Sequence, residues 1–120
     1  MTTKIVPKEG LSLEEGKHQG VIVDVQTRDI PYEYVDFTIG YIDGRKEKEP
    51  ILRYGLPLNP SMNSKLMKFL SLFQKIEPEK EIDIEKIVLK KKVEFMTMNE
   101  DTDKGTFTRV ISDSVKPLKE

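Results

Sequence analysis

The chain has 120 residues, and its 20 basic and 21 acidic residues leave a formal net charge of −1. This length is typical of one domain, and the absence of cysteine excludes disulfides, zinc–thiolate sites and cysteine nucleophiles. A net charge near zero does not favour nucleic-acid binding through the field of the whole protein, so only a local basic surface could support that function.

The composition predicts a folded, mainly β protein with a cytoplasmic location. Leu, Ile, Val and Phe account for 35 of the 120 residues, alanine is absent, and there are eleven Ile, nine Val and eight Thr. β-Branched residues lose rotamer freedom in helices and pack well on sheets. Residues 1–10 lack the apolar segment of a signal peptide, and no run approaches the ~20 apolar residues of a membrane span, so we expect no membrane association.

Two strands are predicted in the first part of the chain. Residues 18–28 alternate as a strand does. The valines on one face of this strand are Val21, Val23 and Val25. After a loop at Pro31, residues 34–42 alternate again and end at a turn over residues 43–44.

The second predicted strand has an apolar face and a polar face. The apolar side chains are Val35, Phe37, Ile39 and Tyr41. The opposite face carries Tyr34, Asp36 and Thr38, and Tyr32 precedes it with the same parity. Two tyrosines therefore lie on the side that should meet water.

A shorter strand is predicted from residue 51, ending before Pro57, and it is followed by a helix over residues 61–76. The apolar residues at helical spacing are Leu66, Phe69, Leu70, Phe73 and Ile76. Ser61 or Ser64 can cap the start of the helix, and Pro78 ends it.

The C-terminal part predicts a hairpin. Asp83 could cap one further helical turn within residues 81–89. Residues 91–98 and 106–112 then alternate as two strands. The connection over residues 99–105 is a polar loop that ends in a glycine.

Three strands, a helix and two strands follow one another. This order predicts a five-stranded OB-fold-like Greek-key barrel with one helix between strands 3 and 4, which plugs one end of the barrel. An open α+β sheet with the helix on one face is the alternative. We expect an N-terminal arm over residues 1–16, an OB-fold-like domain over residues 17–113 and a short tail over residues 114–120.

The sequence argues against an enzyme. His18 is the only histidine and stands at a strand start, where a surface or edge position is expected. No cysteine and no second histidine accompany it, and no glycine-rich phosphate loop is present. We therefore expect no catalytic residues, no metal and no cofactor.

A local basic surface is nevertheless present. Residues 51–75 contain no acidic residue and four basic ones, Arg53, Lys65, Lys68 and Lys75. The ligand face of an OB barrel runs over strands 2 and 3, between the loop that joins strands 1 and 2 and the loop that joins strands 4 and 5. Aromatic rings at such a face stack on bases, and cations contact phosphates. The predicted nucleic-acid-binding residues are Arg28, Tyr32, Tyr34, Lys46, Arg53 and Lys104.

Two observations oppose this interpretation. Tyr34 could instead pack across a neighbouring strand. Glu100, Asp101 and Asp103 also place negative charge in the loop that should grip a phosphate chain.

The sequence resembles the small OB-fold single-stranded-DNA-binding proteins of bacteriophages and prophages, over most of residues 14–111. The resemblance rests on the order of four segments, "EEGKHQGVIVDV", "YEYVDFTIGY", "LPLNPSMNSKLMKFLSLF" and "IDIEKIVLKKKVEFMTMNEDTDKGTFTRVI". It implies a protein that coats single strands during replication or recombination without reading their sequence.

We therefore expect sequence-independent binding of single-stranded DNA by a phage- or prophage-encoded protein in the host cytoplasm. Replication or recombination proteins are possible partners, and a homo-oligomer is possible. The alternative is a non-enzymatic interaction or assembly module that docks a partner protein through the same barrel, with Tyr34 and Arg53 as interface anchors.

Overall fold

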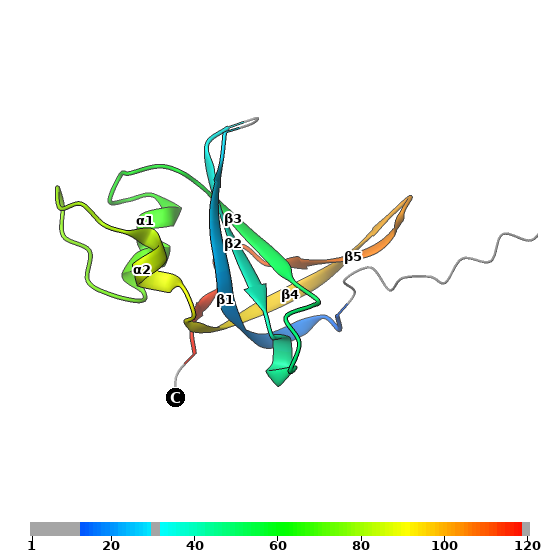
Figure 1. The fold of residues 1–120 in the computed structure, drawn as a ribbon. Helices are drawn as coiled ribbons and strands as arrows, with labels where there is room; N and C mark the ends of the chain where they lie inside the picture. Colours follow the sequence, from blue (N-terminus) through cyan, green and yellow to red (C-terminus); the bar gives the residue numbers. More distant parts are fainter. Residues whose placement is uncertain (1–12, 30–31, 119–120) are drawn as a thin grey trace, which may run out of the picture.

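The computed structural model describes residues 13–29 and 32–118. Its elements in chain order are β1 (Gly16–Arg28), β2 (Tyr34–Gly40), η1 (Ile42–Gly44), β3 (Leu52–Pro57), α1 (Lys65–Ser71), α2 (Ile84–Val88), β4 (Lys92–Thr102), β5 (Gly105–Val110) and β6 (Lys116–Pro117). Figure 1 shows an antiparallel sheet with both helices at one end and the β4–β5 hairpin reaching away from them. The predicted mainly β class is confirmed. Among the described residues, no helix has the length and apolar character needed to cross a membrane.

The sheet is open. Its strands are hydrogen-bonded in the order β3–β2–β1–β4–β5, and β6 pairs with β4. β1 belongs to both halves, because residues 16–21 pair with β4 and residues 21–28 pair with β2. In the described part of the chain no ladder joins β3 to β5, and the hairpin leans away from β3 (Figure 1). The structure therefore has an open sheet of six strands where the sequence predicts a closed barrel of five.

β1 contains a bulge that changes which side chains face the core. The register with β2 shifts between Ile22 and Asp24, so Val23 is the extra residue. Ile22 is fully buried, and Val25 beyond the bulge also packs against the core. The predicted continuous face of three valines is therefore wrong, because the alternation is interrupted at Val23.

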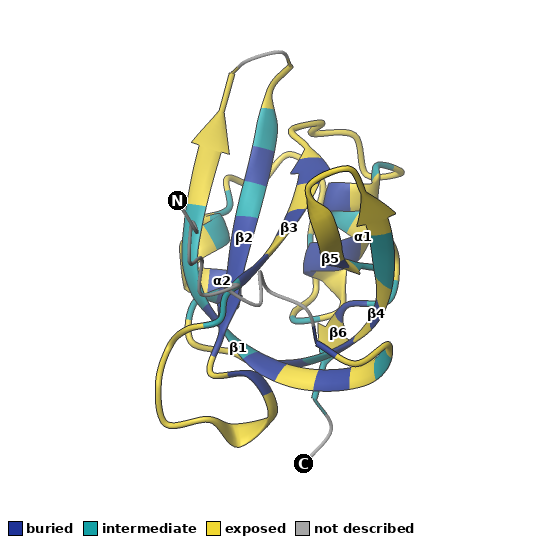
Figure 2. Ribbon diagram, turned by 90° about the vertical axis from the view of Figure 1, so that its right-hand side faces the viewer, coloured by how far each residue is buried: buried dark blue, intermediate teal, exposed yellow. Residues whose placement is uncertain are grey.

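β2 supplies the centre of the core. Val35, Phe37 and Ile39 have no exposed surface, as their alternation predicts. Figure 2 shows buried and half-buried residues alternating along the first part of this strand. Tyr41, predicted on the same face, is 40% exposed, because β2 ends at Gly40 and Tyr41 has a left-handed backbone with φ of 50°.

The close approach of β1 and β2 depends on Gly20. A Cβ atom at this position would lie 2.5 Å from Ile39 Cγ2 and 3.1 Å from the carbonyl oxygen of Gly40. Any side chain at residue 20 would therefore push the two strands apart where β1 passes from one half of the sheet to the other.

α1 covers one end of the sheet and is shorter than the helix predicted over residues 61–76. Ser64, one of the two predicted caps, accepts a hydrogen bond from Met67 N at 3.1 Å. The regular helix stops because the amide of Leu72 bonds only three residues back, to Phe69 O at 3.1 Å.

Specific contacts hold both helices in place. The Phe69 ring on α1 meets Phe37, Tyr54 and Phe73 edge-on, at centroid distances of 5.0, 5.4 and 5.1 Å. Asp83 caps the start of α2, because its side chain accepts a hydrogen bond from the amide of Lys86. The predicted additional helical turn is therefore confirmed.

The β4–β5 ladder extends further than predicted. It continues to the pair formed by Thr102 and Gly105, so residues 103–104 alone form the turn and the predicted loop over residues 99–105 is wrong. Polar cross-strand bonds hold this end of the hairpin. The two bonds are Thr108 Oγ1 to Asn99 Oδ1 at 2.8 Å and Thr106 Oγ1 to Asp101 Oδ1 at 2.7 Å.

The packed region extends past both predicted boundaries, residues 17 and 113. Leu13 is 8% exposed, and its amide donates to Thr108 Oγ1 at 2.7 Å. Val115 is 2% exposed, next to the pairing of β6 with β4. Residues 1–12 of the predicted arm and residues 119–120 of the predicted tail lie outside the described residues.

His18 is buried, so the predicted surface or edge position is wrong. Its Nδ1 lies 2.6 Å from Asp43 Oδ2, and its Nε2 lies 2.6 Å from the carbonyl oxygen of Glu14. Burial acts to lower the pKa of His18, but the Glu14 carbonyl and the Asp43 carboxylate outweigh it, so the pKa is raised above the ordinary 6.5. The ring ties the segment before β1 to the turn after β2.

Candidate nucleic-acid interface

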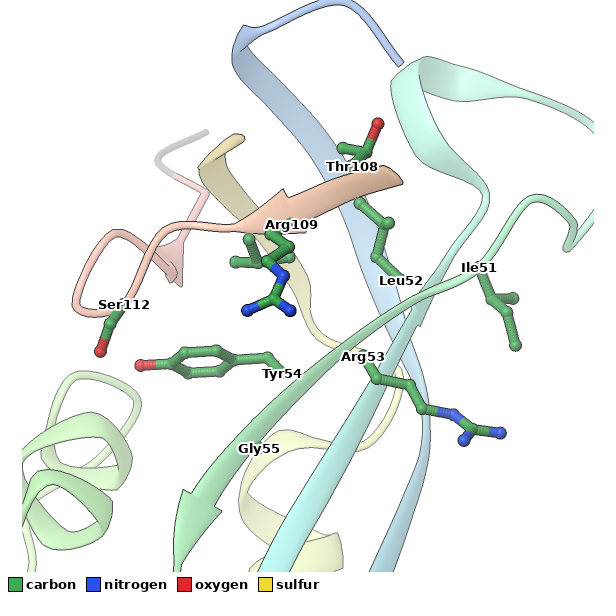
Figure 3. Close-up of a pocket in the computed structure, with 9 residues that line it drawn as sticks. Ile51, Leu52, Arg53, Tyr54, Gly55, Thr108, Arg109 and Ser112 are labelled. Carbon is green, nitrogen blue, oxygen red and sulfur yellow. The ribbon is translucent and has the colours of Figure 1, made fainter. Parts of the chain in front are cut away.

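A cleft separates β3 from β5 where the sheet is open. The cavity has a volume of about 580 Å³ and is lined by residues 51–55 on one wall and by residues 108–110 and Ser112 on the other (Figure 3). Its walls are the two strands at the ends of the hydrogen-bonded order, so each wall is a sheet edge.

The backbone of the β3 edge is turned toward this cleft. In an antiparallel ladder, alternate residues direct their N–H and C=O groups toward the neighbouring strand and away from it. Leu58 N donates to Glu33 O at 2.9 Å, and every second residue before Leu58 likewise directs its backbone toward β2. The backbone N–H and C=O groups of Arg53 and Gly55, which lie between those residues, therefore point away from β2. The cleft therefore offers backbone donors and acceptors as well as side chains.

An arginine stands on each wall. In Figure 3 the Arg109 side chain points from β5 into the cavity, whereas the Arg53 side chain leads from β3 away from the cleft. Both arginines are exposed. Arg109 Nε lies 2.5 Å from Glu100 Oε2, so its charge is partly compensated by the neighbouring strand.

Sequence reasoning predicted Arg53 but missed Arg109. The signal was the alternation in residues 106–111, which places Arg109 on the same side of β5 as Phe107 and Ile111. The alternation predicts on which side of β5 the Arg109 side chain lies. It does not predict that this side borders β3.

Tyr54 separates the cleft from the helices. Its hydroxyl accepts a hydrogen bond from Asp113 N at 3.4 Å and points toward Ser112 (Figure 3). Burial raises the pKa of Tyr54, so the phenol stays neutral at physiological pH and adds no charge to the cleft.

Arg28 and Tyr34 already have partners within the protein. Arg28 donates from Nε to Asp36 Oδ2 at 2.9 Å and from Nη2 to Asp36 Oδ1 at 3.2 Å. Its guanidinium carbon lies 4.8 Å from the centre of the Tyr34 ring, which is half-buried. The cross-strand packing alternative for Tyr34 is thus present in the structure, and the charge of Arg28 is compensated.

Gly55 permits this arrangement. A Cβ atom on Gly55 would lie 2.7 Å from Asp36 Oδ1. The missing side chain leaves room for the Asp36 carboxylate on the outer side of β3, where it holds Arg28.

The other predicted residues lie apart from one another. Tyr32 is 71% exposed and precedes β2, beside Arg28 and Tyr34. Lys46 is exposed in the connection after η1, which Figure 1 shows at the opposite end of the sheet from the β1–β2 loop. Lys104 is exposed in the turn of the β4–β5 hairpin. The structure therefore does not gather the six predicted residues into one cluster.

The outer side of the hairpin carries exposed apolar side chains, which sequence reasoning missed. They are Met96, Met98, Phe107 and Ile111, between 38% and 50% exposed. We call these four side chains, together with Arg109 and Glu100 on the same side of the ladder, the hairpin face. The sequence pattern that could have predicted this face is the position of Met96 and Met98, which have the opposite parity in the strand to the buried Phe95.

Comparisons with known proteins complete the description. No family model matches the chain, and no match was found among curated proteins. Within residues 13–29 and 32–118, no group of three or more His, Asp or Glu side chains is placed to hold a metal ion.

Proposed function

We propose that this protein binds single-stranded DNA without sequence preference and without catalysis, through the cleft between β3 and β5 and the loops that flank it. The strand order supports the proposal. β1 is shared by the two halves, and the helices follow β3 and precede β4, as we would expect of an OB-fold whose barrel is open on one side. OB-folds bind oligonucleotides near the β2–β3 side, which here includes one wall of the cleft.

The observation that carries the proposal is the arginine on each wall of an open cleft. A phosphodiester chain in the cleft meets Arg109, which points into the cavity, and it meets Arg53 where it passes over β3 to the outer side of that strand. The exposed contact between Arg109 and Glu100 is of a kind that contributes only about 0–1 kcal/mol, so a phosphate can replace the carboxylate at little cost.

Exposed rings supply the second element of single-strand binding. Tyr32 is 71% exposed in the β1–β2 loop, and Phe107 is 40% exposed on β5. Stacking of a base on such a ring contributes about 1 to 3 kcal/mol and does not depend on the base. Tyr34 and Arg28 play a smaller part, because each already contacts the other. Lys104 at the hairpin tip and Lys46 beyond η1 act only on longer strands.

This chemistry suits a protein that coats single strands during replication or recombination. We infer a bacteriophage or prophage origin and a place in the host cytoplasm, with replication or recombination proteins as partners and self-association as an accompanying property. These assignments rest on the resemblance to phage single-stranded-DNA-binding proteins.

Fluorescence anisotropy with labelled oligo-dT tests the proposal. The wild type should bind at about 50 mM salt and lose affinity steeply by about 200 mM salt. The double variant Arg53→Gln/Arg109→Gln should bind more weakly. Its log–log salt slope should be less negative by about 1.4, which is about 0.7 for each of two lost phosphate contacts.

Lys75→Gln/Lys86→Gln is the matched control, because it also removes two exposed positive charges, neither of which lines the cleft. It should leave the affinity almost unchanged. Tyr32→Ala should weaken binding without changing the salt slope, since it removes a ring and no charge. Failure of the wild type to bind at low salt would exclude DNA binding.

A protein-interaction module is the second candidate, and the hairpin face favours it. Methionines and aromatic rings are enriched in protein–protein interfaces, and this face exposes Met96, Met98 and Phe107 together. A wild type that binds no oligonucleotide at low salt would make this the better proposal.

A further inference from the structure

We propose that the DNA track continues from the cleft, past Tyr54, into a second cavity beside α1, where Lys65 and Lys68 bind phosphates. The inference rests on the proposed function and assigns a part of the binding surface that was not among the predicted binding residues. It gives the protein a footprint longer than the cleft alone.

The two cavities adjoin at Tyr54. The second cavity has a volume of about 360 Å³, with Lys65, Lys68 and Leu72 on the helix side and Asp113 on the other. Tyr54 lines both cavities. Its hydroxyl is held by Asp113 N, and the residue before Asp113 lines the first cavity. A strand that leaves the cleft and crosses over the contact between Tyr54 and Asp113 therefore reaches the second cavity next.

The charge along this path is complementary to a polyanion. Lys65 and Lys68 are three residues apart on α1, so they project from the same side of the helix, and both are exposed. They belong to the acid-free segment that also contains Arg53. Asp113 is the opposing charge at the second cavity, where two lysines and one carboxylate leave a net positive charge.

The second cavity also offers an apolar contact. Leu72 is 54% exposed beside the two lysines, and Phe69 forms part of the wall. Sugars and base edges of a single strand can cover Leu72 while the phosphates face Lys65 and Lys68. The cavity thus combines cations with an apolar surface, as single-strand binding grooves do.

Oligonucleotide length separates this track from the cleft. We would titrate labelled oligo-dT of about 6 and about 16 nucleotides, which span the range of site sizes for a single OB-fold. Lys65→Gln/Lys68→Gln should weaken binding of the longer strand several-fold and make its salt slope less negative by about 1.4. Binding of the shorter strand, which fills the cleft alone, should not change.

Lys75→Gln/Lys86→Gln is the matched control, because it removes two exposed lysines that line neither cavity. Asp113→Asn should strengthen binding of the longer strand only, and asparagine tolerates the left-handed backbone at this position, φ of 68°. The proposed track is wrong if Lys65→Gln/Lys68→Gln weakens binding of both oligonucleotides equally. It is also wrong if the control pair weakens binding as much as this pair does. If the wild type binds neither strand, the proposed function itself is wrong. If it binds both and the first lysine pair has no effect, only the track is wrong.

Discussion

On the outer side of β1 and β2, polar side chains already pair with one another, whereas on the hairpin face apolar side chains meet solvent. Both regions contain an arginine bound to a carboxylate. Arg28 makes two hydrogen bonds with Asp36, whose side chain is only 20% exposed. The Arg109 and Glu100 side chains form their ion pair while 69% and 44% exposed.

The difference shows that an arginine on a sheet surface is available to a ligand only if the ligand can replace the carboxylate that the arginine already binds. Arg28 is fixed by a bidentate contact and by the Tyr34 ring, so it stabilises the β1–β2 ladder. Arg109 is held by a weaker exposed pair and points into a cavity. Arg28 is therefore part of the structure of the sheet, whereas the side chain of Arg109 is 69% exposed.

Truncating one phenylalanine on β2 and one on β5 gives the largest expected contrast. Phe37→Ala should lower the free energy of unfolding by about 3 to 5 kcal/mol, because the ring is fully buried against Phe69. Phe107→Ala should change it by no more than about 0.5 kcal/mol, because the ring is exposed. Urea denaturation followed by circular dichroism measures both. A large loss for Phe107→Ala would mean that the hairpin face is covered in solution.

His18 tests the junction between the two regions. Its folded-state pKa is raised, so its stabilising contribution is complete below the unfolded pKa of about 6.5 and is lost as pH rises through the folded value. The free energy of unfolding should therefore fall as the pH rises above about 6.5, by at most about 1.4 kcal/mol per pH unit. In His18→Gln, which cannot titrate, this part of the pH dependence should disappear. If the free energy of unfolding of the wild type rises over the same pH range, the pKa of His18 is not raised in the folded state.

Neutralising the two carboxylates compares the arginine pairs themselves. Asp36→Asn should destabilise the protein by about 1 kcal/mol, because a charged bidentate contact that is partly exposed is weakened. Glu100→Gln should change stability by less than about 0.5 kcal/mol. It should, however, raise the affinity for oligo-dT a few-fold, because Arg109 becomes free for phosphate. Equal destabilisation by the two substitutions would show that the pairs do not differ.

The local patterns were predictable because each depends on a short stretch of sequence. The alternation of Val35, Phe37 and Ile39 predicts the buried side of β2, and Ser64, one of the two predicted caps, is the cap of α1. The turn capped by Asp83 follows from the same kind of signal. In each case a few neighbouring residues determine the local structure.

The open side of the sheet was not predictable from such patterns. Arg53 and Arg109 line one cavity although they are far apart in the chain, and no alternation tells how two distant edges meet. The bulge at Val23 was missed because a single extra residue leaves the valine alternation in the sequence intact. The burial of His18 was missed because its partners, Glu14 and Asp43, come from the segment before β1 and from η1 after β2.

The bulge in β1 has a consequence on the far side of the molecule. Both ladders are anchored to this one strand, and a bulge bends a strand and increases its twist. A bend at Val23 therefore contributes to the distance between the edges of β3 and β5. One additional residue in the first strand thus affects how wide the opening between two later strands becomes.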